Sequence, residues 1–155
     1  MSMRGGIWHI LLTCLALGFA PILQALERPE SQNPAQNYLL FCAGCHGLDG
    51  AGAPHKVPTL RNTLALLLTV DGGRDYLTRV PGVANSALTD NALAGVLNWC
   101  LEHFTDPARS SPAKPFTVTE LKAARSQPLL SVQASRQAVL QRAGVSASAL
   151  KESAY

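Results

Sequence analysis

The chain has 155 residues, which is enough for one domain with tails and too few for two ordinary domains. Hydrophobic residues make up 47% of it and charged residues 15%, the balance of a globular protein with a buried core. The formal net charge is only +3, and no long run of lysine or arginine occurs, so we expect no nucleic-acid partner.

The first 25 residues have the three-part pattern of a secretory signal peptide. Arg4 precedes an apolar stretch from Ile7 to Phe19, and Leu23-Gln24-Ala25 provides a small-residue cleavage site. We predict cleavage after Ala25, a short lead over residues 26–33 and export to the periplasm. An uncleaved anchor is the alternative, but the apolar stretch is shorter than the roughly 20 residues that span a membrane. We therefore expect no stable membrane insertion after cleavage.

A helix from Pro34 to Ala43 is predicted next, because Asn33 is a favourable N-cap and proline is favoured at the first helical position. We expect this helix to bury its large apolar side chains, namely Tyr38, Leu39, Phe41 and Cys42. The following loop, residues 47–60, is rich in glycine, which lets a backbone pass close to a flat ring.

Between the helix and the loop, residues 42–46 read Cys-Ala-Gly-Cys-His, and this spacing is typical of covalent haem c attachment. Two intervening residues allow both sulfurs to meet the vinyl groups on neighbouring porphyrin edges. The adjacent histidine then presents a neutral imidazole nitrogen to the iron from the same side. The motif therefore predicts one covalent haem c bound through Cys42 and Cys45, with His46 as the proximal iron ligand.

Three other uses of this cysteine pair fit the sequence less well. A thioredoxin-type pair follows a strand and opens a helix, whereas this pair follows a predicted helix and runs into a loop. A zinc site needs a second ligand pair, and the mature chain offers only Cys100, His55 and His103, without paired spacing. A disulfide across so short a loop would leave His46 unexplained.

Further along, short helices are predicted over residues 63–70 and 75–79, with a turn at Asp71-Gly72-Gly73 between them. Val80-Pro81-Gly82 is predicted to start a loop. A longer helix is then expected from Asp90 to His103, capped by Thr89 and ended by Asp106-Pro107. Its apolar residues recur at helical spacing: Leu93, Val96, Leu97, Cys100 and Leu101.

Residues 107–155 read as a Pro- and Ser-containing linker followed by a helical C-terminal extension. The stretch Thr117-Val118-Thr119-Glu120 is a capping box that opens a helix through Ser126. A second amphipathic helix is expected from Ser131 to Ala143, before Gly144. Such helices need a surface to bury against, which favours packing on the preceding domain. Docking to a partner enzyme is the alternative interpretation.

From residue 34 to residue 104, the chain resembles the small all-α monohaem cytochromes c. The matching features are the helix before Cys42, the Cys-His motif, the Gly-rich loop, the stretch Val57-Pro58-Thr59-Leu60 and the segment from Leu88 to Trp99. The resemblance implies an all-α cytochrome c fold over residues 34–106, with the C-terminal helices as an addition to it.

The resemblance also carries expectations about the iron ligands. It implies that the Pro58 carbonyl accepts a hydrogen bond from the iron-free nitrogen of His46, which would fix the ring. The family commonly uses a methionine just before a proline as the second ligand, but Val80 stands there and valine cannot bind iron. The mature chain has no methionine at all. His55 and His103 are the remaining weak candidates, although both are expected at the surface.

Four further residues have a functional and an ordinary interpretation. Cys100 could bind iron as a thiolate, but its apolar neighbours favour a core position. Arg61 or Arg74 could pair with a haem propionate, because a guanidinium matches a carboxylate, or could be solvated. Trp99 could lie against the haem edge, or could simply pack in the core.

Two functions follow from these expectations. The first is single-electron transfer in the periplasm, with a dehydrogenase or oxidase as redox partner, or as the haem subunit of an exported dehydrogenase. The second, suggested by the missing methionine, is a five-coordinate haem protein that binds or senses small gaseous ligands. A peroxidase is less well supported, because no acid–base group lies near Val80. We therefore expect an electron carrier without catalytic residues.

Overall fold

The structure is a computed structural model that describes residues 30–109 and 113–146. The predicted leader lies outside the described residues, so cleavage after Ala25 stays a prediction. Within the described ranges the fold is all-α, as expected, and the sole extended pairing is an isolated bridge between Ala53 and Val57. None of the helices in these ranges is long and apolar enough to cross a membrane.

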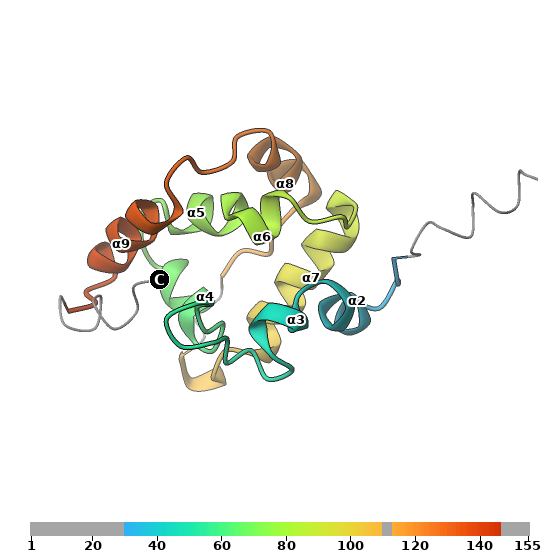
Figure 1. The fold of residues 1–155 in the computed structure, drawn as a ribbon, viewed down its shortest axis with the longest axis horizontal. Helices are drawn as coiled ribbons and strands as arrows, with labels where there is room; N and C mark the ends of the chain where they lie inside the picture. The colour runs from blue at the N-terminus through green and yellow to red at the C-terminus, as the bar shows by residue number, and fades with distance from the viewer. Residues whose placement is uncertain (1–29, 110–112, 147–155) are drawn as a thin grey trace, which may run out of the picture.

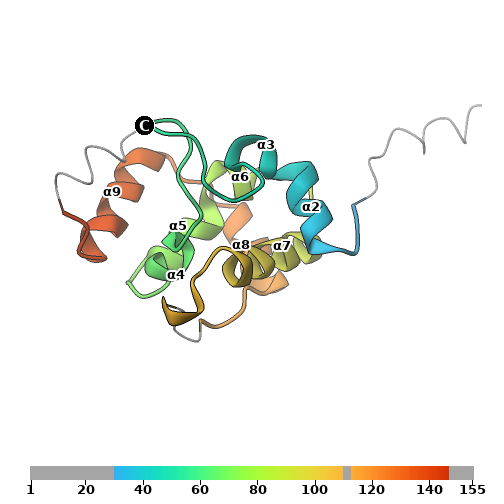
Figure 2. The ribbon, with the colours of Figure 1, turned by 90° about the horizontal axis from the view of Figure 1, so that it is seen from below.

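Helices of different length and direction are joined by short turns and longer loops (Figures 1 and 2). In chain order they are α2 Pro34–Phe41, α3 Ala43–His46, α4 Thr63–Leu67, α5 Gly73–Arg79, α6 Pro81–Ala84, α7 Asp90–His103, the 3-10 turn η1 Pro107–Arg109, α8 Val118–Arg125 and α9 Val132–Arg142. The predicted bounds of the long helix coincide with those of α7, and Thr89 caps it by accepting from the Ala92 N–H.

The packing of α2 against α7 forms one side of the core. Tyr38 of α2 is fully buried, and its ring centroid lies 5.2 Å from the ring centroids of both Trp99 and Phe104. Asn33 caps α2 as predicted, and its side chain accepts a hydrogen bond from the Ala35 N–H. This packing holds the segment that follows α2 against the core.

Three local predictions were wrong. Leu39 is 53% exposed rather than buried, because successive helical residues rotate by about 100° and Tyr38 takes the inward position. Residues 80–82 do not start a loop, since Pro81 occupies the first position of the short helix α6, where its fixed φ favours a helical turn. The helix predicted over residues 63–70 is also shorter, and ends at Leu67.

The C-terminal extension packs against the rest of the molecule, as the first of its two interpretations predicted. The capping box of α8 is present, with Thr117 Oγ1 accepting from the Glu120 N–H. Leu121 of α8 and Val139 and Leu140 of α9 belong to the same hydrophobic core as Tyr38. In Figure 1, α8 lies over α5 and α6, and α9 lies beside α5.

Candidate haem-binding site

The Cys-x-x-Cys-His motif lies on one short helical turn that is tied to the core. Cys42 ends α2 and caps α3, and its N–H donates to the Tyr38 carbonyl over 2.9 Å. Gly47 ends α3 with a φ of +76°, and its carbonyl accepts a hydrogen bond of 2.6 Å from the buried Tyr38 hydroxyl. The motif is therefore anchored at both of its ends through Tyr38.

The Gly-rich loop folds back so that Pro58 meets the motif. The Gly52 N–H donates to the His46 carbonyl over 2.8 Å, and Ala53 and Val57 exchange two backbone hydrogen bonds of 2.9 and 2.8 Å. Gly52 has a φ of +72°, a left-handed conformation that glycine adopts without steric cost. These bonds close a tight turn over residues 53–57 and return the chain toward His46.

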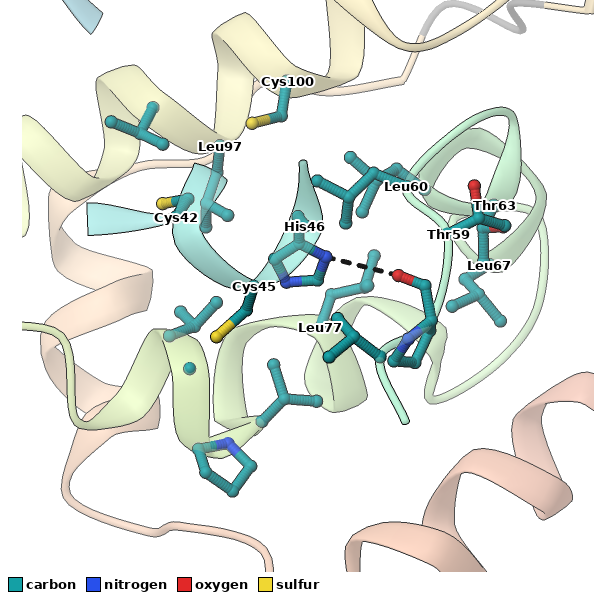
Figure 3. A pocket seen from close by; sticks show the side chains of 18 of the residues that line it. Cys42, Cys45, His46, Thr59, Leu60, Thr63, Leu67, Leu77, Leu97 and Cys100 are labelled. Atoms are coloured by element: carbon teal, nitrogen blue, oxygen red, sulfur yellow. Dashed lines mark hydrogen bonds between the residues drawn. The ribbon is translucent and has the colours of Figure 1, made fainter. Parts of the chain in front are cut away.

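Cys42, Cys45 and His46 line one cavity of about 320 Å³. Figure 3 shows His46 projecting into it beside Cys45, with apolar side chains from other helices around them. The apolar lining includes Leu60, Leu64, Leu67, Leu77, Val80, Val83, Leu93, Val96 and Leu97. A cavity of this size with a few polar groups on one wall is typical of cofactor sites.

The imidazole of His46 is held in one orientation. Its Nδ1 lies 3.2 Å from the Pro58 carbonyl oxygen, and a carbonyl can only accept, so Nδ1 carries the proton. The hydrogen bond that the resemblance implied is therefore present (Figure 3). Burial lowers the pKa of His46, and the Pro58 hydrogen bond partly opposes this shift. The ring is thus neutral at neutral pH, with the Nε2 lone pair free for a metal.

Both cysteines of the motif are free thiols rather than a disulfide. Burial, and after it the nearby Cys45, raises the pKa of Cys42 to about 11. Two free thiols and one orienting histidine on one wall, facing an apolar space, fit a flat, apolar, iron-containing ring that is attached through sulfur. A zinc ion fits less well, because the described residues contain no group of three or more His, Cys, Asp or Glu side chains able to hold a metal.

Comparison with known proteins agrees with this geometry. Cytochrome c-552 of Thermus thermophilus is 34% identical to the chain over 106 residues, which cover 57% of this chain and 81% of that protein. A second cytochrome c-552 of the same species is also 34% identical over 106 residues, covering 57% of this chain and 72% of that protein. This chain is a c-type cytochrome. No family model matches it, and no solved structure matches it significantly.

Neither weak candidate for the distal ligand reaches the cavity of this cytochrome. His55 lies in the exposed loop turn with a φ of 59°, and His103 stacks on Trp99 with ring centroids 4.3 Å apart. Val80 lines the cavity together with other aliphatic side chains, none of which can bind iron. Among the described residues that line the cavity, His46 supplies the only imidazole.

The remaining sulfur in the cavity wall belongs to Cys100 of α7 (Figure 3). Its side chain is only 4% exposed, and burial, followed by the nearby Cys42, raises the pKa of the thiol well above its usual range. This burial among apolar side chains favours a packing role for the Cys100 side chain. The core interpretation of Cys100 agrees with its burial.

The two arginines that were candidates for pairing with a propionate are engaged elsewhere. Arg61 forms an ion pair with Asp49, and Arg74 forms one with Glu120 of α8. Neither side chain lines the cavity. Carboxylates contributed by the loop and by α8 already neutralise both guanidinium groups, so the structure does not favour the propionate interpretation for either residue. Trp99 likewise packs in the core rather than lining the cavity.

The sequence did not predict that a buried arginine lies in the cavity wall. Arg136 of α9 is only 7% exposed and lines the cavity together with Val132. It lies in the extension, outside the segment that resembles the family, so no motif pointed to it. A signal was nevertheless present, since Val132, Arg136, Val139 and Leu140 have the spacing of a single helix face.

Proposed function

We propose that this cytochrome carries one haem c, joined by thioether bonds to Cys42 and Cys45 and ligated by His46, and that it transfers single electrons. The observation that carries the proposal is the arrangement of both free thiols and the Pro58-oriented imidazole on one wall of an apolar cavity. Haem supplies the ferric–ferrous couple when bound, and the protein sets its potential and its access.

The residues around the site suit this role. The Pro58 carbonyl fixes the His46 ring and makes its free nitrogen a stronger donor to iron. The aliphatic lining excludes water, which disfavours the more highly charged ferric state. Cys45 is exposed, so the ring edge attached there lies near the surface, where an electron can enter or leave.

Location and partner belong to the same proposal. The signal-peptide pattern over residues 1–25 supports export to the periplasm, because thioether-linked cytochromes with such leaders act outside the cytoplasm. We propose a periplasmic dehydrogenase or oxidase as the redox partner, with this chain acting as a free carrier or as the haem subunit of the dehydrogenase.

A second candidate function has an observation of its own. Methionine occurs only at residues 1 and 3, and the described residues that line the cavity include no methionine and no histidine besides His46. A haem with an open sixth position binds carbon monoxide or nitric oxide. Binding or sensing of a small gaseous ligand is therefore the alternative to electron transfer.

Spectroscopy of the purified mature protein tests both candidates. The pigment is expected to remain with the polypeptide in acidified organic solvent, and its absorbance and electron paramagnetic resonance spectra to show histidine ligation. Release of the pigment would overturn the proposal. Carbon monoxide is then added to the reduced protein. An unchanged spectrum supports the electron carrier, whereas rapid binding supports the gas-binding alternative.

A further inference from the structure

Arg136 is a buried cation in the wall of the haem-binding cavity, and the described polypeptide provides no partner for it. The residue is only 7% exposed to solvent, and its Nε has no hydrogen-bond acceptor among the described residues. The neighbouring Val139 and Leu140 are buried in the core, and α9 packs against α5. The helix that carries Arg136 is therefore fixed by packing against the core.

The other arginines with described side chains all have partners. Those that form ion pairs are Arg61 with Asp49, Arg74 with Glu120, Arg79 with Asp75 and Arg125 with Asp90. Arg142, which lies on the same helix as Arg136, donates from Nε to the Asp71 carbonyl over 2.8 Å. Burial of an unpaired charge is unfavourable, so an anion beside Arg136, which the described polypeptide does not provide, would stabilise it.

The composition of the cavity wall also favours an anionic partner for Arg136. Its charged members are Lys56 and Arg136, and no aspartate or glutamate lines it among the described residues. Lys56 is exposed at the loop, whereas Arg136 is buried. A haem has an apolar ring and two carboxylate side chains, which complement an aliphatic cavity that carries a buried cation.

We propose that the Arg136 guanidinium forms a charge-assisted hydrogen bond with a haem propionate, so that the C-terminal extension completes the haem site. This inference rests on the proposed attachment of haem at Cys42, Cys45 and His46. The extension thereby supplies a positioning residue for the cofactor, in addition to packing against the domain. A cation next to the haem also stabilises the ferrous state, the direction in which a methionine ligand would act.

Three variants of the full-length holoprotein test the assignment. Arg136→Gln removes the charge, Arg136→Lys keeps it, and Arg142→Gln is the matched control on the same helix. One charge roughly 10 Å from the iron, at an effective dielectric of about 20, changes the ferrous-to-ferric ratio by about tenfold. We therefore expect this ratio to be about tenfold lower in Arg136→Gln than in the wild type. Arg136→Lys is expected to recover most of the ratio, and Arg142→Gln to leave it unchanged.

A second measurement identifies the anion. Redox-induced infrared difference spectra of protein whose haem carries ¹³C-labelled propionates report the carboxylates directly. A carboxylate band is expected to move in Arg136→Gln and to stay in place in Arg142→Gln. An unmoved carboxylate band together with an unchanged ferrous-to-ferric ratio in Arg136→Gln would overturn the assignment. Unmoved carboxylate bands together with altered carbon monoxide binding would also overturn it, because they would place the guanidinium at the iron.

A measurement on the wild-type protein tests the same inference even if a variant fails to fold. In a crystal structure of the holoprotein, one propionate oxygen is expected within hydrogen-bond distance of the Arg136 guanidinium. Two propionates that both lie away from Arg136 would contradict the inference while leaving the haem attachment intact. Release of haem into acidified organic solvent would instead contradict the proposed function, so the two failures are distinguishable.

Discussion

Gly52 lies so close to Pro58 that a Cβ atom on Gly52 would be 2.7 Å from the Pro58 carbonyl oxygen. The same Cβ would lie 2.4 Å from the Val57 carbonyl oxygen. The Pro58 oxygen is the acceptor of the hydrogen bond from His46. The orientation of the proposed iron ligand therefore depends on the absence of a side chain at residue 52.

Gly52→Ala is expected to displace the Pro58 carbonyl and weaken its bond to His46. The positive φ costs alanine about 1–2 kcal/mol, and the backbone clash adds to this, so we expect at least about 2 kcal/mol lower stability in urea unfolding. The ferric magnetic resonance spectrum should also change, because the ring orientation is no longer fixed.

Gly95→Ala is the matched control for that variant. The added Cβ would lie 3.5 Å from the nearest atom of Pro34, which is an ordinary contact, and Gly95 lies inside α7. We expect unchanged spectra and a gain of up to about 1 kcal/mol from helix propensity. Equal spectra and stability in wild type and Gly52→Ala would contradict the role assigned to Gly52.

Replacing both Cys42 and Cys45 with alanine is expected to give a protein without covalent haem that does not fold. The cavity lining would lose the ring that it surrounds, and a ligand that binds only the native state stabilises that state. Absorbance after extraction and circular dichroism measure the two effects. Cys100→Ala is the control and should keep its haem. A colourless double variant with wild-type thermal stability would disprove this prediction.

The ion pair between Arg74 and Glu120 predicts an acid-dependent contribution to stability. The Arg74 hydrogen bond, helped by the Thr117 N–H and opposed by burial, lowers the pKa of the Glu120 carboxyl. A carboxyl whose pKa is lowered on folding stabilises the native state above its unfolded pKa, about 4.3, and this stabilisation is lost as the pH falls through the folded pKa.

Glu120→Gln should therefore cost about 1–2 kcal/mol at pH 7, and the difference from wild type should shrink below about pH 4. Urea unfolding at a series of pH values measures it. Asp75→Asn is the control, because the Asp75 side chain is 62% exposed in its ion pair with Arg79 and an exposed pair contributes less than about 1 kcal/mol. A pH-independent difference for Glu120→Gln would rule out the ionic explanation.

Arg125 connects α8 to the segment before α7. Its guanidinium donates to the carbonyls of Ala84, Ser86 and Leu88 and to the Asp90 carboxylate. Arg125→Ala leaves these acceptors without a donor, and we expect a loss of about 2–3 kcal/mol in the free energy of unfolding.

Lys122→Ala changes an exposed residue on the same helix and should shift the free energy of unfolding by less than about 0.5 kcal/mol. Thermal and urea unfolding of both holoproteins provide the comparison. If Arg125→Ala and Lys122→Ala were equally stable, the hydrogen bonds of Arg125 would contribute nothing measurable to the docking of α8.

Local signals accounted for most of the helix positions. Asn33 with Pro34, Thr89, and Thr117 with Glu120 each begin a helix where predicted, because capping depends on residues within one turn of each other. The errors at Leu39 and at residues 80–82 have a different origin. Residues that are distant in the chain decide which face of a short helix is buried. They also decide whether a Pro-Gly segment forms a loop or a helical turn.

The attachment motif over residues 42–46 could be recognised from the chain alone, because covalent attachment needs reactive groups at a fixed short spacing. The lack of methionine beyond residue 3 could be recognised in the same way. The position of Arg136 in the cavity wall could not be recognised in this way. Arg61, Arg74 and Arg136 are the same residue type, yet packing pairs the first two with carboxylates and leaves the third buried in the cavity wall. Burial and partner choice result from contacts between segments far apart in the chain, which no local pattern records.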